Sequence, residues 1–391
     1  MDSNSKDAVA QLDELLGSSN QAWLFGAGIS FNAGIPLMFP LTEQVFKRAE
    51  VHGKPTDKGA LDWIKSQLVE DCHIEHMLSQ IGDLRSIAER SRNQVVGLDS
   101  ATFTLDELDA FHQRILKWVA ETVRWGYRPA RDGQEEQIGT KDLPIVTISD
   151  HLGFVSALFK ERQKGLSERR RAVKFFTTNY DTLLEDALAL SSLPYWDGFA
   201  GGAVAFRNHR YGGEEPDPGV RAHVIKLHGS IDWHLGEEGR VWRVRDGDLY
   251  PELSSRVLIY PQSTKYLATQ RDPFAAQFDL LRRSLASTDE NVFATCGYSF
   301  GDEHINQEIE LSMERPGNKT TFLAFSQGLN PTLERWRASS WKNRLYIISD
   351  QGIYVGDEGP HAAPSESNKL SWWTFQGVTK LLINGPEACI Q

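Results

Sequence analysis

Four short strings in the chain combine residue types that can bind or activate a small ligand. They are GAGIS (26–30) followed by GIP (34–36), TTNYD (177–181), LHGS (227–230) and GYSFGD (297–302). Histidine exchanges protons near neutral pH, and hydroxyl, amide and carboxyl groups orient water or a sugar. Glycines let a backbone approach a pyrophosphate. These types favour chemistry on a ligand that carries phosphate and ribose.

The GAGIS string follows an apolar run at 22–25 and has two interpretations. A phosphate group would bind at the glycine backbone and at the N–H groups of a following helix. The alternative is a tight turn without a ligand, since the usual GxGxxG spacing fails at Phe31. This string alone does not decide between them.

The other three strings each place polar side chains beyond an apolar run. Residues two apart on an extended strand face the same way, so Asn179 and Asp181 are predicted to point into one crevice. Their alternative role is to cap a helix that begins near Thr182. His228 is a candidate proton acceptor, although a lone histidine is more often structural. The string GYSFGD offers groups for a ribose or adenine edge, or is an ordinary loop.

The elements that position these strings are predicted strands. Short apolar runs occur at 22–25, 172–177, 224–227, 257–260, 291–296, 320–325 and 345–348. Helical or loop material separates most of them, which is typical of a Rossmann-like α/β fold with a mostly parallel sheet. Ligands bind outside the carboxyl ends of such strands. The four strings are therefore expected to converge on one site.

The rest of the chain differs in texture. Residues 41–170 are predicted to be mostly helical, with one apolar face on 74–88 and another on 105–123. Residues 351–391 are interpreted as a linker rich in Gly, Pro and Ser at 356–369, followed by a docking segment. The predicted organisation is a core of 1–40 and 171–350, a helical insertion of 41–170 and this C-terminal piece.

Composition narrows the class of protein. Apolar residues make up 40% and charged residues 24% of the 391-residue chain, and neither a secretory start nor a long apolar run is present, so a cytoplasmic protein is expected. Three scattered cysteines predict neither a disulfide framework nor a cysteine zinc site. The formal charge of −11 argues against direct nucleic-acid binding.

Two further groups have a functional and a structural interpretation. His73 and His76 lie three apart, as two metal ligands on a helix would, but no third ligand is evident, and no metal is expected. The string YPQSTKY (260–266) follows a predicted strand. Its Lys265 would steer a diphosphate or be a surface lysine.

The order of the four strings resembles the sirtuin family, and most closely its branch in bacterial anti-phage systems. The resemblance covers 23–36 and 175–325. It implies NAD binding by three groups of residues. The diphosphate and nearby ribose would be held by Gly26, Ala27, Gly28 and Ser30, and the nicotinamide by Ile35 and Pro36. The adenosine would be held by Gly297, Ser299 and Asp302.

The resemblance also implies catalytic roles. Asn179 would orient the ribose and a water, Asp181 would hold the nicotinamide side, and His228 would act as general base. The chain departs from protein-deacylating sirtuins because it has no zinc-binding CxxC pairs and reads GIPLMFP where they carry an arginine. Water is therefore the expected acceptor, and the expected reaction is hydrolysis of NAD to nicotinamide and ADP-ribose.

The same resemblance implies a setting and partners. It implies NAD depletion in anti-phage defence by a homo-oligomer that a HerA-type ATPase regulates, with a short Argonaute as the alternative partner. Other functions remain open: an NAD-dependent protein deacylase or ADP-ribosyltransferase, and a non-catalytic sensor of NAD or ADP-ribose.

Overall fold

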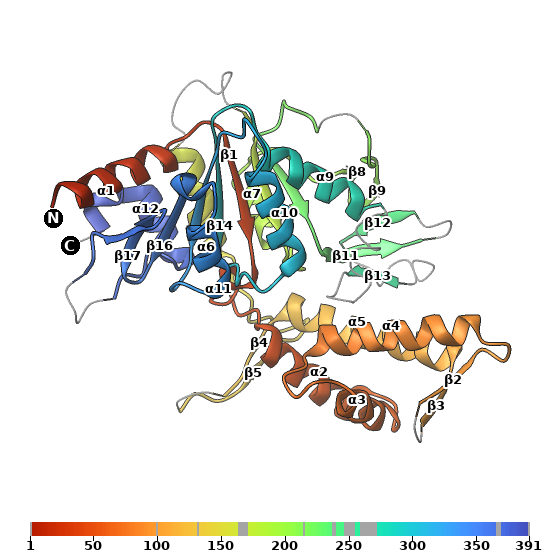
Figure 1. Ribbon diagram of the computed structural model, residues 1–391. Coiled ribbons are helices and arrows are strands. Elements are labelled where there is room, and N and C mark those ends of the chain that lie inside the picture. The colour runs from red at the N-terminus through yellow and green to blue at the C-terminus, as the bar shows by residue number, and fades with distance from the viewer. Residues whose placement is uncertain are drawn as a thin grey trace.

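A nine-stranded sheet forms the centre of the computed structural model (Figure 1). The structure describes residues 2–98, 101–130, 133–162, 171–213, 216–236, 240–245, 255–258, 272–364 and 369–389. The string YPQSTKY and Lys265 lie outside these residues. Among the described residues, none of the helices has the length and apolar character needed to cross a membrane.

The strand order in this sheet is β18-β17-β16-β15-β14-β1-β6-β10-β7. All pairs from β7 to β16 are parallel, and only the β16–β17 and β17–β18 pairs are antiparallel. This confirms the predicted α/β fold with a mostly parallel sheet. The strands are β1 (Gln21–Phe25), β6 (Val173–Thr177), β7 (Tyr195–Trp196), β10 (Ala222–Lys226), β14 (Asn291–Cys296), β15 (Thr320–Phe325), β16 (Leu345–Ser349), β17 (Gly352–Val355) and β18 (Glu358–His361).

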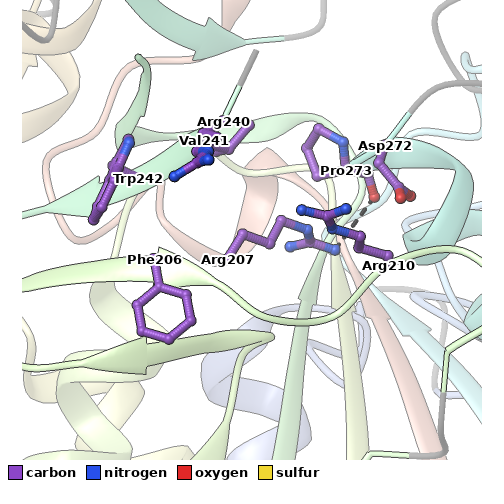
Figure 2. Close-up of a pocket in the computed structure, with 8 residues that line it drawn as sticks. All are labelled: Phe206, Arg207, Arg210, Arg240, Val241, Trp242, Asp272 and Pro273. Carbon is purple, nitrogen blue, oxygen red and sulfur yellow. Dashed lines mark hydrogen bonds between the residues drawn. The ribbon is translucent and has the colours of Figure 1, made fainter. Parts of the chain in front are cut away.

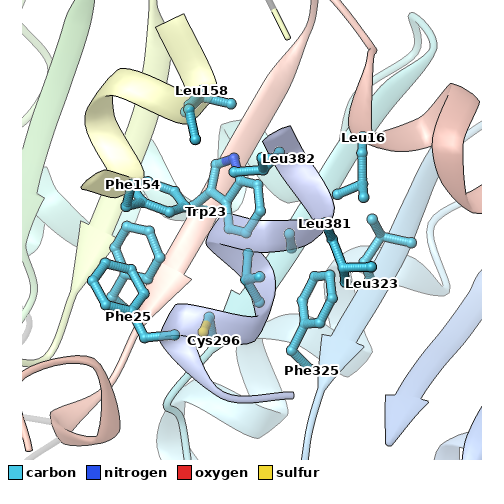
Figure 3. Close-up of a cluster of buried hydrophobic side chains, with 14 of the residues drawn as sticks. Leu16, Trp23, Phe25, Phe154, Leu158, Cys296, Leu323, Phe325, Leu381 and Leu382 are labelled. Atoms are coloured by element: carbon cyan, nitrogen blue, oxygen red, sulfur yellow. The ribbon is translucent and has the colours of Figure 1, made fainter. Parts of the chain in front are cut away.

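Helices cover both faces of the sheet, so its central strands are buried and mostly apolar. One face packs on α1 (Ser3–Leu16), α6 (Ser149–Ser156), α7 (Leu183–Leu190) and α12 (Phe375–Asn384). The other packs on α9 (Phe274–Leu285), α10 (Glu303–Met313) and α11 (Pro331–Arg337). Figure 3 shows Trp23 and Phe25 of β1 against Phe154 of α6. The Phe25 and Phe154 ring centroids are 5.4 Å apart.

The C-terminal segment differs from its predicted form. Residues 356–369 were expected to be a linker, yet β18 lies within them and extends the sheet next to β17. Helix α12 beyond them supplies four fully buried or nearly buried side chains to the core, which are Phe375, Val378, Leu381 and Leu382. Glycine and proline at an edge strand are tolerated because one side of that strand needs no ladder partner.

Four of the helices between β1 and β6, α2 to α5, gather around a buried cluster of their own, which we call the helical unit, whereas α6 packs on the main sheet. In Figure 1 they lie beside one end of the main sheet. The unit contains α2 (Met38–His52), α3 (Asp57–Ser66), α4 (Ile74–Arg90) and α5 (Leu105–Trp125). Both helices predicted from apolar faces are present. Two short hairpins were not predicted, and they are β2 (Val95–Leu98) with β3 (Ala101–Thr104) and β4 (Tyr127–Arg128) with β5 (Gln137–Ile138).

A second sheet, antiparallel and five-stranded, was not expected. Its order is β13-β11-β12-β9-β8. The run at 257–260 was predicted to join the main sheet, but in its described part β13 pairs with β11 instead. Gly229, with φ of 83°, starts β11 directly after the parallel strand β10. The strands are β8 (Phe199–Gly201), β9 (Val204–Arg207), β11 (Gly229–Leu235), β12 (Val241–Val244) and β13 (Ser255–Leu258).

Candidate active site

The four chemistry-bearing strings follow four strands that are neighbours in the main sheet. These strands are β14, β1, β6 and β10, in that order. The chain leaves β1 toward β6 and β10 on one side, and β14, β15 and β16 lie on the other side. Crevices for ligands form at such reversals of strand order, outside the carboxyl ends. The strings thus meet at one edge of the sheet, as predicted.

Ser30 joins the loop after β1 to the loop after β6. Its Oγ donates to Asp181 Oδ2 at 2.9 Å and accepts from Asn179 Nδ2 at 3.2 Å. All three side chains are buried. Tyr180 instead donates its hydroxyl to Glu75 Oε1 of α4, at 2.8 Å. The spacing of two therefore brings Asn179 and Asp181 together on one side of the strand end.

Asn179 carries an unmatched acceptor. Its backbone N–H donates to Thr177 Oγ1 at 3.0 Å, which fixes the turn of the loop. Its Oδ1 is buried and has no hydrogen-bond partner among the described residues. Such an unpaired buried group costs about 1–3 kcal/mol. A ribose hydroxyl or a water at this position would remove that cost, so the residues fit a ribose-containing ligand.

Asp181 makes two hydrogen bonds that have different roles. Besides the bond to Ser30, its Oδ1 accepts from the Leu183 N–H at 3.0 Å, at the start of α7. Asp181 therefore has the structural role at the start of α7 that the capping interpretation predicts, and its role toward a ligand stays a prediction. The two hydrogen bonds fix the position of its carboxyl group.

His228 lies against Asp302. The His228 Nε2 is 3.1 Å from Asp302 Oδ2, and the two side chains are 9% and 14% exposed. Asp302 begins α10, where its Oδ1 accepts from the N–H groups of His304 and Ile305, and its role in binding adenosine stays a prediction. The anchored carboxylate fixes the imidazole ring. Its negative charge also lies beside the ring that would become positive on accepting a proton.

The glycines in the loops after β1 and β14 have a packing role. A Cβ on Gly26 would lie 2.5 Å from the Gly297 carbonyl oxygen, and one on Gly28 would lie 2.7 Å from Gly297 Cα. The Gly28 N–H donates to that same carbonyl at 3.0 Å. The turn interpretation therefore explains Gly26 and Gly28, and the Gly28 N–H is already used. Ala27 and Ser299 are exposed in these loops.

The GIP segment connects the crevice to the helical unit. Ile35 is buried and belongs to the cluster of the helical unit, while its N–H donates to the Ser30 carbonyl at 3.2 Å. Pro36 is buried as well. The Gly34 carbonyl accepts from the Tyr127 N–H of β4 at 3.0 Å. A shift of the helical unit would therefore also move the backbone at Ser30.

Lys226 and Glu185 form a buried pair next to Asp181 that was not predicted. Lys226 Nζ donates to the Asp181 carbonyl and lies 3.4 Å from Glu185 Oε1. Burial raises the pKa of Glu185 to about 7, although the Lys226 charge opposes this. The available signal was a lysine inside an otherwise apolar strand, two residues before His228.

His151 is a second buried group that was missed. It lies on α6 with no exposed surface, and its ring centroid is 5.1 Å from that of Phe375. Burial lowers its pKa, and the charges of Asp181 and Asp150 oppose that shift. Neither ring nitrogen has a hydrogen-bond partner in the described part of the chain. Its position in an apolar helix gave no sequence signal.

His73 and His76 lie at the start of α4 and support its first turn. The His76 Nδ1 accepts from the His73 N–H at 3.3 Å. Within the ranges that the structure describes, no group of three or more His, Cys, Asp or Glu side chains is placed to hold a metal ion.

Comparisons with known proteins add a family likeness. Residues 173–346 match the family model described as the SIR2-like domain, which includes Asn179, His228 and Asp302. A match also exists to the structure of Sir2Tm bound to a propionylated peptide, with 14% identity and a TM-score of 0.31 over 83% of this chain and 88% of that one. No curated protein matches the chain. The domain match supports a sirtuin-like region, and thus the class of enzymes that use NAD.

Proposed function

We propose that the protein is an NAD⁺ glycohydrolase, which cleaves NAD⁺ to nicotinamide and ADP-ribose with water as the acceptor. The observation that carries the proposal is the buried Asn179 amide at the carboxyl end of β6, which Ser30 holds and whose oxygen has no hydrogen-bond partner among the described residues. His228, in the loop after β10, lies against Asp302, in the loop after β14, and would be the proton acceptor. The SIR2-like match supports NAD as the substrate.

The chemistry of the bond suits these groups. The nicotinamide ring is positively charged while attached and leaves as a neutral molecule with the electron pair of the C–N bond, so no acid is required. The ribose carbon gains positive character as the bond breaks. Fixed dipoles and carboxylates beside that carbon stabilise the charge. Asn179 would hold the ribose and a water in line, and the fixed Asp181 carboxylate would lie near the nicotinamide side.

A water molecule next to His228 would complete the reaction. As the water oxygen bonds to the ribose carbon, the water loses a proton, and His228 accepts it. Asp302 holds the ring in position for that transfer and stabilises the resulting charge. The products are nicotinamide, ADP-ribose and one proton, so atoms and charge balance without a metal or a redox partner.

The test measures nicotinamide and ADP-ribose released from NAD⁺ by the purified protein, alone and with a co-expressed HerA-type ATPase. We expect Asn179→Ala and His228→Ala each to lower the rate by about 100-fold or more. The matched controls Asn208→Ala and His52→Ala change the same residue types at exposed positions and should retain the wild-type rate. Wild-type protein that binds NAD⁺ but releases no nicotinamide in either state would contradict the proposal.

A second arm separates hydrolysis from protein modification. NAD⁺ is supplied with and without an acetylated peptide, and products are identified by mass spectrometry. A hydrolase releases ADP-ribose at the same rate in both. Release that requires the peptide and yields O-acetyl-ADP-ribose would assign a deacylase, and ADP-ribose found on protein would assign a transferase.

We further propose that the protein depletes NAD⁺ in anti-phage defence, as a homo-oligomer regulated by a HerA-type ATPase, with a short Argonaute as the alternative partner. Support comes from the order of the four motifs, which resembles that branch of the family. Phage infection of cells that carry both genes, with wild type or Asn179→Ala, tests the role. Protection that survives the substitution would contradict it, and light scattering of the co-expressed proteins tests the assembly.

A further inference from the structure

The second sheet contains a hollow that the candidate active site does not use. Its volume is about 550 Å³, which is within the range of small-molecule sites. Strands β9 and β12 and the residues before α9 line it, and none of the predicted site residues does (Figure 2). The lining residues are Phe206, Arg207, Arg210, Arg240, Val241, Trp242, Asp272 and Pro273.

More arginines than carboxylates line the hollow, in a protein that is acidic as a whole. Three arginines, Arg207, Arg210 and Arg240, line it against one carboxylate, Asp272. The Asp272 oxygens already accept from the Tyr211 N–H, at 3.0 and 3.1 Å. The chain as a whole has a formal charge of −11, so its composition does not account for this local excess. A concave surface with arginines of one sign attracts and orients an anion.

Arg207 is the residue that points to a bound group. Its guanidinium lies over the rings of Phe199 and Trp233, at 5.5 and 5.6 Å, and one nitrogen donates to the Pro273 carbonyl at 3.3 Å. Its Nε and Nη1 are buried without hydrogen-bond partners in the described residues. Burial lowers the pKa of Arg207 to about 10, because the Asp272 and Asp197 charges only partly offset it.

The charges of Asp272 and Asp197 act on Arg207 without either carboxylate forming an ion pair with it. Within the described residues, no carboxylate makes an ion pair with Arg207. A buried charge without a partner is destabilising, and arginine is the side chain whose planar donors best match phosphate oxygens. A phosphate bound in the hollow, with the exposed Arg210 and Arg240 around it, would supply the missing charge.

The other side of the hollow is aromatic. Phe206 of β9 and Trp242 of β12 are directly paired across the two strands, and Phe206 is 51% exposed. Figure 2 shows these two rings on one side, Arg210 and Asp272 on the other, and Arg207 between them. Aromatic rings at a surface bind the flat face of a base by stacking.

We propose that this hollow is a second ligand site, which binds a nucleotide with its phosphate on the arginines and its base on Phe206 and Trp242. A ligand of that class unites the two halves of the hollow, because it carries an anion at one end and a flat ring at the other. A mononucleotide is favoured over a nucleic-acid strand, since the acidic chain repels an extended polyanion.

The experiment is calorimetric titration of the full-length protein with AMP, and with adenosine and inorganic phosphate as the separate halves. We expect AMP to bind more tightly than either half, and its affinity to fall at least ten-fold in Arg210→Gln and in Phe206→Ala. Both of these side chains are exposed, so the fold should tolerate the changes. Arg315→Gln, at an exposed position elsewhere, is the matched control and should bind AMP as the wild type does.

Three results would overturn the proposal. The first is wild-type protein that does not bind AMP at millimolar concentration. The second is binding that Arg210→Gln and Phe206→Ala leave unchanged while Asn179→Ala abolishes it, which would place AMP in the crevice. The third is a thymidine oligomer that binds more tightly than AMP through the same residues, which would assign a nucleic-acid surface. None of these readouts depends on nicotinamide release, so the two proposals fail separately.

Discussion

At the scale of single residues, the candidate site is a set of fixed polar groups joined across strands. Ser30, Asn179 and Asp181 hold one another, and Asp302 holds His228. Each of these side chains is also tied to a backbone group or to a neighbour, so little reorganisation is needed when a ligand arrives. Such preorganisation is the main source of electrostatic stabilisation in enzymes.

The His228–Asp302 contact leads to the first prediction. In Asp302→Asn the amide oxygen still accepts from the His304 and Ile305 N–H groups, so α10 keeps its cap. The negative charge beside His228 is lost, and proton transfer is expected to slow by about 100-fold. We expect kcat for nicotinamide release to fall with KM little changed, and its pH profile to shift. A variant with the wild-type pH profile would exclude this role.

Glu185 leads to a prediction about pH and stability. Its folded pKa is raised to about 7 from an ordinary value of 4.5, so the folded protein binds the extra proton between these values. Stability therefore falls as pH rises from about 4.5 to 7, because the unfolded chain releases that proton more readily. Urea unfolding of the wild type and Glu185→Gln at pH 5 and pH 8 measures this. The wild type should lose stability relative to the variant at pH 8, and an equal difference at both pH values would contradict the prediction.

At the scale of elements, the helices that cover the sheet matter as much as the strands. Phe154 of α6 contacts Trp23 and Phe25 of β1 and stacks on Phe375 of α12, at centroid distances of 5.0 to 5.4 Å. One side chain thus links the strand that leads into GAGIS with the C-terminal helix. This is why the segment after 351 belongs to the core.

Phe154→Ala tests that link. The side chain is fully buried, and its loss leaves a cavity between two helices and the sheet. We expect the free energy of unfolding to fall by about 3–5 kcal/mol. Phe39→Ala, at a 55% exposed position, is the control and should change it by less than about 1 kcal/mol. Denaturant unfolding followed by circular dichroism gives both values, and similar losses in the two variants would contradict this assignment of the core.

At the scale of the whole molecule, the helical unit has a separate core that meets the crevice through the GIP segment. Ile35 packs into that core, and its N–H bonds to the carbonyl of Ser30. A change in the helical unit would therefore reach the Ser30–Asn179–Asp181 group directly. We expect acid to destabilise this unit before the rest of the protein.

The half-buried His73 and the buried His112 make the helical unit sensitive to acid. Burial lowers the pKa of His73 and of His112 to about 4 from an ordinary 6.5. The unfolded chain binds these protons below pH 6.5, so stability is lost as pH falls from 6.5 toward 4. Thermal unfolding at pH 7 and pH 5 should show this loss, and His112→Leu should reduce it. An unchanged pH response in the variant would contradict the assignment.

Local sequence patterns were enough to predict the α/β class, most strands of the main sheet, the helices at 74–88 and 105–123, and the meeting of the four strings. These follow from local patterns, because an apolar run that ends in polar and glycine residues marks the carboxyl end of a buried strand. The two-residue spacing likewise placed Asn179 and Asp181 together.

Only the tertiary structure decided which side chains meet across the strands. Asp302 lies against His228, which comes from a different strand end, and Lys226 contacts the carbonyl of Asp181, 45 residues away in the chain. The second sheet, with its arginine-lined hollow, arises from antiparallel pairs between short and separated strands. Such contacts depend on packing between distant segments, and no local periodicity records them.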